Sequence, residues 1–160
     1  MQKNKLLIRN AKKEDSLQIA DVLLDFYNIE DREEAKKVFF NEFKKEFHYI
    51  VAIEDNEILG LATWLVHGLP KHGLFELDRI CILGNSRGKG IGKNLVNALI
   101  DDAKRWYMNR NGKARKLYLL THEDNTNAHL FYEKVGFKHE CTLKDHYYKN
   151  QDERVYTIFL

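Results

Sequence analysis

The segment from Gly84 to Gly92 combines four glycines with two cationic side chains, Arg87 and Lys89. A strand-like run precedes this segment, and a long amphipathic run that is typical of a helix follows it. The first backbone N–H groups of a helix have no intrahelical acceptor and lie at the positive end of the helix dipole. Glycines let a phosphate approach such groups closely. The segment is therefore predicted to bind a phosphate or pyrophosphate group.

Two common phosphate-loop patterns do not fit this segment. The nucleoside-triphosphate loop requires Ser or Thr after Gly-Lys, where this chain has Asn94, and a glycine where it has Arg87. The dinucleotide pattern Gly-x-Gly-x-x-Gly fails because the last three glycines are each two residues apart. The pattern that remains is Arg-x-x-Gly-x-Gly, formed by Arg87, Gly90 and Gly92 at the start of a helix.

Two carboxylates lie on the predicted strand before the glycine segment. Because side chains alternate between the faces of a strand, Glu76 and Asp78 are predicted to share one face with Ile80 and Ile82. Such a pair can accept a proton or bind a cation. The competing interpretation is that both carboxylates form ion pairs with surface lysines or with Arg79.

Composition and charge exclude several classes of protein. The 160 residues fit one domain, predicted over 1–160, and 26 basic against 24 acidic residues leave no extended basic surface for nucleic acid. The two cysteines form no Cys-x-x-Cys pair, and the seven histidines show no metal-binding spacing, so no metal is expected. The longest apolar stretch, Ile58 to Val66, is far shorter than a membrane span of about 20 residues. A cytoplasmic protein without a membrane partner is expected.

Hydrophobic periodicity predicts a mixed succession of strands and helices. Strands are predicted over residues 5–9, 48–54, 57–66, 74–83, 116–121, 137–148 and 154–160. Helices are predicted after an N-cap at Asp15, from Asp31 onward, from the glycine segment to Asn111-Gly112, and over 126–135. The strand, long helix and strand in the middle form a βαβ unit, whose two strands must be parallel. The fold class is α/β (α+β), with a mixed sheet of about seven strands and about four helices.

A second pattern begins at Asn125 and runs to Phe137, as Asn-x-x-Ala-x-x-x-Tyr-x-x-x-Gly-Phe without a gap. Together with the glycine segment, it resembles the two cofactor motifs of the GNAT superfamily of acyl-CoA-dependent N-acyltransferases, in the same order and at a similar separation. The resemblance implies a twisted, mostly antiparallel sheet with a splayed parallel pair at its centre. It also implies acetyl-CoA as the acyl donor.

The resemblance assigns a set of residues to the cofactor. Backbone groups of Ile80, Cys81 and Ile82 would pair with the pantetheine arm. Asn125 would face the same arm, and it could also cap the following helix. Cys81 could accept the acetyl group, but a buried, chemically inert thiol is the preferred interpretation. The pyrophosphate would be held by the backbone amides of Arg87, Gly88, Lys89, Gly90, Ile91 and Gly92.

The resemblance also assigns catalytic roles. Tyr132 matches the tyrosine that protonates or hydrogen-bonds the departing thiolate, although it could instead be a packing residue. Glu76 lies eleven residues before Arg87, where some members carry a general base. A base is required because an alkyl ammonium, with a pKa of about 10.4, must lose a proton before it attacks. Asp78 is the alternative base.

The expected function is acetyl transfer to a primary amine by direct attack in a ternary complex. A small acceptor is preferred, such as a polyamine, an amino acid or an aminoglycoside. An N-terminal or lysine residue of a protein is the alternative. The resemblance disfavours a ribosomal-protein N-terminus, because family members that act on N-terminal peptides tend to carry a Glu-rich strand end where this chain has Leu120-Thr121-His122. A non-catalytic sensor that binds acyl-CoA is the alternative from another class. The sequence leaves the oligomeric state open, a homodimer included.

Overall fold

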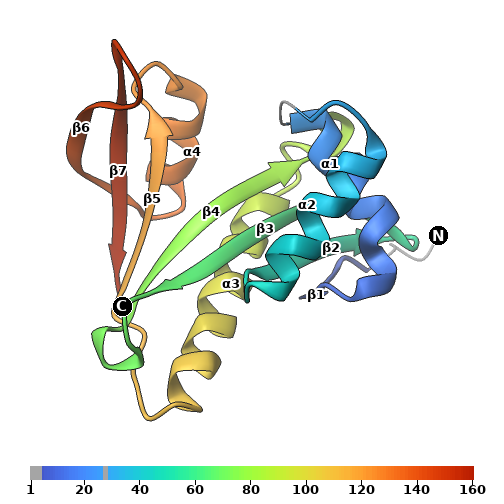
Figure 1. The fold of residues 1–160 in the computed structure, drawn as a ribbon, viewed down its shortest axis with the longest axis horizontal. Helices are drawn as coiled ribbons and strands as arrows, with labels where there is room; N and C mark the ends of the chain where they lie inside the picture. The colour runs from blue at the N-terminus through green and yellow to red at the C-terminus, as the bar shows by residue number, and fades with distance from the viewer. Residues whose placement is uncertain (1–4, 27–28) are drawn as a thin grey trace. The chain divides into compact units, whose positions relative to one another are not determined.

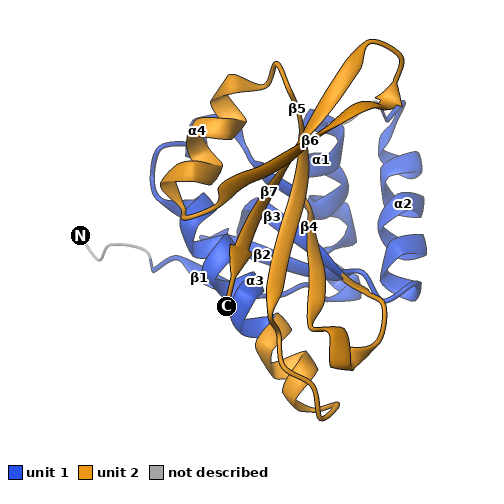
Figure 2. Cartoon of the chain, turned by 90° about the vertical axis from the view of Figure 1, so that its left-hand side faces the viewer, with its two compact units in different colours: residues 1–65, 79–102 blue, residues 66–78, 103–160 orange. Residues whose placement is uncertain are grey.

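The computed structural model describes residues 5–26 and 29–160. The chain divides into two compact units. Unit 1 comprises residues 1–65 and 79–102, and unit 2 comprises residues 66–78 and 103–160 (Figure 2). The chain passes between the units three times, so each unit contains segments that are distant in the sequence. A single acetyltransferase domain over 1–160 stays a prediction, and each unit is described by itself.

The described residues form seven strands and four α-helices (Figure 1). The strands are β1 (Leu7–Asn10), β2 (His48–Glu54), β3 (Glu57–His67), β4 (Leu74–Ile82), β5 (Lys116–His122), β6 (Lys138–Tyr148) and β7 (Gln151–Phe159). The helices are α1 (Ser16–Phe26), α2 (Arg32–Lys44), α3 (Ile91–Met108) and α4 (Thr126–Lys134). The sheet order is β1-β2-β3-β4-β5-β7-β6, with β4 and β5 parallel. The predicted fold class, a mixed seven-stranded sheet with a parallel pair and four helices, is confirmed.

In unit 1, helices α1 and α2 cover strands β2 and β3 with one apolar cluster (Figure 1). Apolar residues at helical spacing, such as Ile19 and Leu23 on α1 and Phe39 on α2, are removed from water. They pack against β2, β3 and Cys81 at the end of β4. The edge of the Phe39 ring also meets Tyr49 with 5.0 Å between the ring centroids. Burial of this apolar area stabilises unit 1 and holds the end of β4.

In unit 2, strands β5 and β7 form a continuous antiparallel ladder, and β6 pairs with the other edge of β7. The parallel ladder between β4 and β5 has three pairs, which join Leu74 to Lys116, Phe75 to Leu117 and Glu76 to Tyr118. The hydroxyl of Tyr107 on α3 donates a hydrogen bond of 2.6 Å to the carbonyl of Leu74. Burial raises the pKa of this phenol to about 12, so the hydroxyl stays a donor at neutral pH. The ladder with β5 and the hydrogen bond from Tyr107 therefore hold the first residues of β4, Leu74 to Glu76, in place.

Most predicted boundaries agree with the structure to within two residues, but the start of α1 was predicted wrongly. Asp15 is not an N-cap, because it ends a 3₁₀ turn over Lys13–Asp15 that leads into Ser16. Its carboxylate accepts the backbone N–H of Lys12 and pairs with Arg9. Asp31 does cap α2, since its side chain accepts the N–H of Glu34.

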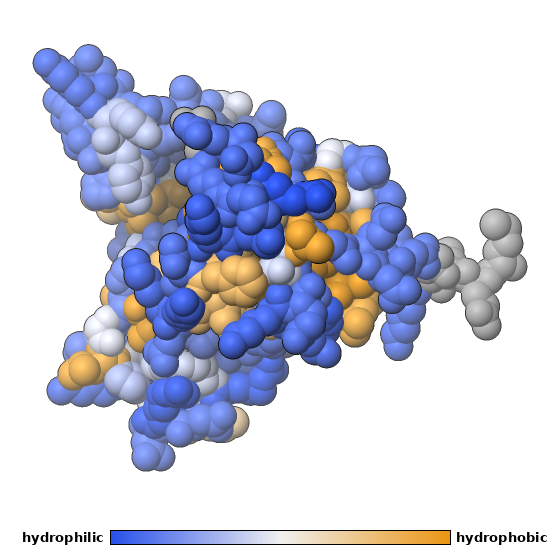
Figure 3. All heavy atoms as spheres, turned by 45° about the vertical axis from the view of Figure 1, so that its right-hand side comes forward, coloured by the Kyte–Doolittle hydropathy of each residue, from blue (hydrophilic) through white to orange (hydrophobic). Residues whose placement is uncertain are grey.

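The surface in Figure 3 is mostly hydrophilic, with hydrophobic residues in small groups. Over residues 5–26 and 29–160, none of the helices combines the length and the apolar character that a membrane crossing requires.

Candidate active site

The glycine segment lies in unit 1 and connects β4 to α3. A 3₁₀ turn over Gly84–Ser86 follows the strand, and the helix starts at Ile91. Gly88 and Gly90 have φ angles of +77° and +79°, a region that L-residues rarely adopt. A Cβ atom on either residue would meet no heavy atom within 4 Å among the residues that the structure describes. The segment therefore exposes backbone to solvent at the start of a helix.

The geometry of this segment fits a pyrophosphate. The N–H of Asn94 donates to the carbonyl of Gly90, which makes Gly90 the residue that precedes the first helical turn. Helix geometry therefore leaves the amides of Ile91, Gly92 and Lys93 without an intrahelical acceptor. Lys89 is exposed beside them. A loop with exposed backbone, unpaired amides and positive charge is suited to an anion with several oxygens.

Arg87 binds the glycine segment to the end of β4 through a hydrogen bond. Its Nε donates a hydrogen bond of 3.0 Å to the carbonyl of Ile82. The centre of its guanidinium group lies 5.1 Å from the centroid of the Phe26 ring. Arg87 thus holds the strand end and the loop together, in addition to contributing positive charge.

The three strand residues predicted to meet pantetheine lie at the end of β4. Ile80 and Ile82 are half-buried, whereas Cys81 is only 1% exposed and belongs to the core of unit 1. A Cβ atom on Gly60 would lie 2.6 Å from the carbonyl oxygen of Cys81, so glycine is required there for β3 to approach. The structure supports the interpretation of Cys81 as a packing residue.

The residues of the second motif lie in unit 2. The side chain of Asn125 accepts the N–H of Ala128 at 3.3 Å and thereby caps α4. Tyr132 is half-buried, and its ring packs edge-on against Phe137 with 5.7 Å between the centroids. The Tyr156 ring lies 6.0 Å away, also between centroids. Packing on two sides fixes the direction in which the phenol points.

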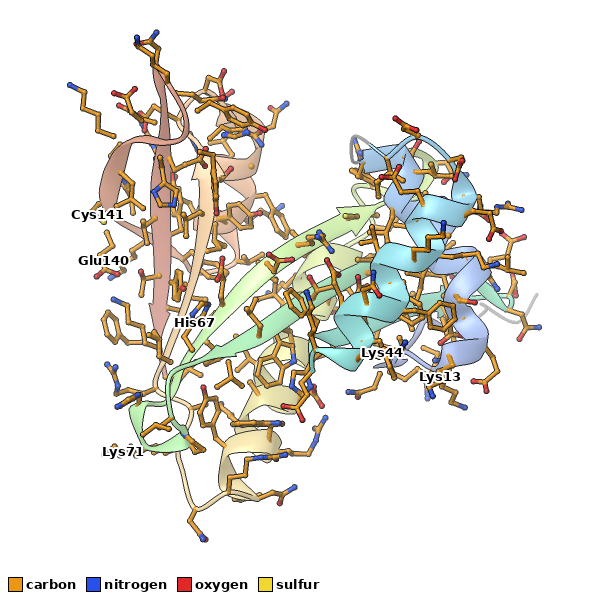
Figure 4. The ribbon with its side chains drawn as sticks, viewed as in Figure 1. Lys13, Lys44, His67, Lys71, Glu140 and Cys141 are labelled. Carbon is orange, nitrogen blue, oxygen red and sulfur yellow. The ribbon has the colours of Figure 1, made fainter. Side chains whose placement is uncertain are left out.

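Glu76 has two partners that the sequence analysis did not identify. Its Oε2 atom lies 2.6 Å from Nε2 of His67 at the end of β3. The same oxygen accepts a hydrogen bond of 3.2 Å from the hydroxyl of Tyr118 on β5. Figure 4 labels His67 at the end of β3, beside β4 and β5. The expected pairing with surface lysines or Arg79 is wrong for Glu76, and Arg79 instead pairs with Glu42 in unit 1.

The electrostatics of unit 2 connect both predicted carboxylates to one tyrosine. Burial raises the pKa of Tyr147 on β6, and the negative charges of Glu76, Glu153 and Asp78 raise it further. Glu76 and Asp78 therefore both contribute negative charge to the surroundings of Tyr147. Burial and the charge of Glu76 likewise raise the pKa of Tyr118.

Glu153 on β7 is a further acidic residue that sequence reasoning missed. It is 2% exposed, and its carboxylate contacts Nδ1 of His122. Its position in the strand register, opposite His122, explains the contact. Alternation along β7 could have suggested an inward-facing residue, but only the pairing register identifies His122 as its partner.

The comparisons with known proteins agree on one family. The family model described as "Acetyltransferase (GNAT) family" matches residues 17–137, which include both motifs. The spermine/spermidine N(1)-acetyltransferase of Bacillus subtilis is 31% identical over 107 residues. These residues cover 61% of this chain and 65% of the relative, so the match spans slightly less than two thirds of that protein.

Solved structures show the same fold. An N-acetyltransferase from Staphylococcus aureus superposes with a TM-score of 0.75 at 25% identity, over 97% of this chain and 98% of the other. A variant of the spermidine N-acetyltransferase from Vibrio cholerae has a TM-score of 0.75 at 21% identity, over 96% and 93% of the two chains. At such identities, the likeness to the Vibrio protein concerns the fold alone.

The exposed backbone at Gly90 leads to a test of the cofactor site. Gly90→Asp and Gly90→Asn have side chains of nearly equal size, and both residues tolerate a positive φ better than most. If the segment binds the pyrophosphate of acetyl-CoA, the added charge should weaken binding by at least about tenfold relative to Gly90→Asn. Isothermal titration calorimetry with acetyl-CoA measures the difference, and circular dichroism checks folding. Equal affinities of the two folded variants would contradict the assignment.

Proposed function

The chain belongs to the GNAT family of acetyltransferases, and from this premise we propose that it transfers the acetyl group of acetyl-CoA to a primary amine of a small polyamine. The observation that carries the choice of acceptor is the group of carboxylates in unit 2, with Glu76 and Asp78 on β4 and Glu153 on β7, where Glu76 and Glu153 have only histidines as ion-pair partners among the described residues. The name of the Bacillus relative, a spermine/spermidine acetyltransferase, points to the same class of acceptor.

The charges of unit 2 support a polycationic acceptor. Among the residues that the structure describes, the ion-pair partners of Glu76 and Glu153 are the histidines His67 and His122, and neither carboxylate pairs with Lys or Arg. Within the described part of the chain, neither carboxylate therefore has a permanently cationic side chain as its ion-pair partner. A polyamine carries several ammonium groups separated by short methylene chains, and each gains Coulomb energy near a carboxylate.

The proposed reaction has one proton transfer at the acceptor nitrogen and one at the leaving sulfur. When bound, acetyl-CoA supplies the acetyl group as a thioester, a reactive acyl donor. Glu76 accepts the proton that the acceptor ammonium must lose before its nitrogen attacks the carbonyl carbon. As the C–N bond forms and the C–S bond breaks, Tyr132 donates a proton to the leaving sulfur, and the second proton that the nitrogen loses restores the phenol. Ile80 to Ile82 and the glycine segment hold and orient the donor.

Several features of the chain support these roles. Glu76 lies at the end of the three-pair ladder between β4 and β5, where the backbone is fixed. Tyr132 has a ring held by Phe137 and Tyr156, which suits a donor that must keep one direction. Asp78, two residues after Glu76 and exposed, is assigned to the binding of acceptor charge.

The test of this function is an assay of thiol release from acetyl-CoA with a panel of acceptors. Spermine and spermidine should be acetylated with a higher kcat/KM than monoamines, amino acids, aminoglycosides or peptides with a free N-terminus, since only polyamines offer several closely spaced cations. Mass spectrometry of the product should show one added acetyl group. A preference for peptides would support the protein-acetyltransferase alternative. Binding of acetyl-CoA without transfer to any amine would support the sensor alternative.

The roles of the two carboxylates are separable by isosteric variants. Glu76→Gln should lower kcat for the best polyamine by about tenfold or more, because the amide cannot accept a proton. The loss should shrink as the pH rises from 6 toward 10, since alkaline solution supplies neutral amine. Asp78→Asn is the matched control and should mainly raise KM. Equal kcat of Glu76→Gln and wild type at the acid end would remove Glu76 from the mechanism, and a selective kcat loss in Asp78→Asn would move the base there.

Tyr132 is tested at the leaving group. Tyr132→Phe keeps the ring contacts with Phe137 and Tyr156, so folding and acetyl-CoA affinity should be retained. Loss of the proton donor should lower kcat by about 100-fold. Steady-state kinetics and calorimetry measure the two effects separately. A wild-type kcat in a folded variant would show that Tyr132 is a packing residue.

A further inference from the structure

The Glu76 carboxylate is held from one side only. The ring of His67 and the hydroxyl of Tyr118 both reach the same oxygen, Oε2, at 2.6 and 3.2 Å. Among the residues that the structure describes, no hydrogen bond or ion pair involves the second oxygen, Oε1. A carboxylate has acceptor sites on both oxygens, so this one-sided arrangement leaves a complete set of lone pairs on Oε1.

The three side chains form a small group in unit 2 and come from β3, β4 and β5. We call Glu76, His67 and Tyr118 the Glu76 triad. The His67 and Tyr118 rings also contact each other, with 5.4 Å between the ring centroids and planes inclined by 47°. Tyr118 lies directly opposite Glu76 in the parallel ladder, which fixes its distance from the carboxylate. The Glu76 side chain is 16% exposed and that of His67 is 37% exposed. The three side chains are therefore held by contacts with one another, and Glu76 and His67 remain partly accessible to solvent.

We propose that His67 and Tyr118 are positioning residues, which hold Glu76 through Oε2 so that Oε1 faces the acceptor and accepts the ammonium proton. This inference rests on the proposed role of Glu76 as the base. In the step, one N–H bond of the ammonium breaks, an O–H bond forms at Oε1, and the electron pair of the broken bond stays on nitrogen for the attack. Nothing is oxidised or reduced.

The chemistry of the two partners suits this task. Both groups donate to the carboxylate oxygen, His67 through a proton on Nε2 and Tyr118 through its hydroxyl. The pKa of Tyr118 is raised by burial and by the charge of Glu76, which keeps its hydroxyl protonated. Because both contacts are made to Oε2, the lone pairs of Oε1 stay available for the ammonium.

The test is a double-mutant cycle with acetyl-CoA and spermine. His67→Ala should lower kcat by about tenfold through misplacement of the base, while His67→Gln, which can place an amide N–H near the position of Nε2, should recover most of the loss. Tyr118→Phe keeps the ring and should lower kcat by about tenfold, the effect of one hydrogen bond to a charged group. KM for acetyl-CoA should stay within about twofold of wild type in all three. Tyr148→Phe, at a tyrosine of β6 that is 65% exposed, is the matched control for Tyr118→Phe and should leave kcat unchanged.

The cycle is completed in the Glu76→Gln background. If the partners act through Glu76, His67→Ala and Tyr118→Phe should have no further effect on kcat there. The same loss in both backgrounds would overturn the inference, and so would a His67→Gln variant as impaired as His67→Ala. Tyr118→Phe preserves shape and keeps the test decisive even if His67→Ala does not fold.

The control on the proposed function is separate. Wild-type kcat in Glu76→Gln alone would overturn the assignment of the base and the inference with it. A low kcat in Glu76→Gln combined with normal kcat in His67→Ala and Tyr118→Phe would overturn the inference alone.

Discussion

Strand β4 is the constraint on which the rest of the structure depends. Its first residues pair in parallel with β5 for only three positions and then continue without that partner. Residues 74–78 belong to unit 2 and residues 79–82 to unit 1, so one continuous strand joins the two units. Tyr107 fixes its start through the carbonyl of Leu74, and the missing side chain of Gly60 lets β3 approach at Cys81. Glu76 and Asp78 lie on the part of the strand in unit 2, and the glycine segment follows the part in unit 1.

Elements defined by local chemistry were predictable from the sequence. The hairpin around Asp55 and Asn56 follows from alternation on both sides of two residues that accept positive φ angles, and the structure has this turn at the predicted residues. The cap at Asp31 follows from the residue type before a helical pattern. Asp15 fits the same pattern but was predicted wrongly, because Arg9, six residues earlier, binds its carboxylate in competition with the helix start.

Contacts between distant segments were not predictable in the same way. Glu76 and Asp78 were identified because alternation along one strand is local, whereas the partners of Glu76 depend on register between strands. Tyr118 is 42 residues from Glu76, and only the ladder shows that the two lie opposite each other. The sequence analysis noted only that His122 stands where some family members carry glutamates. The structure shows that the buried carboxylate of Glu153 contacts His122. The negative charge in this region thus comes from the neighbouring strand, where no pattern along β5 could reveal it.

The proton balance of the proposed reaction explains why Glu76 is better placed at a partly exposed position than in the core. An ammonium has three N–H bonds and the acetylated product has one, so two protons leave the nitrogen during each turnover. The departing thiolate takes up one of them in net terms, since the proton that Tyr132 donates must be replaced. The other proton has to reach solvent, and Glu76 must release it before the next acceptor binds. The Glu76 side chain is 16% exposed and that of its partner His67 is 37% exposed, so a proton can pass from the triad to water. A partly exposed base such as Glu76 can therefore be recharged in every cycle.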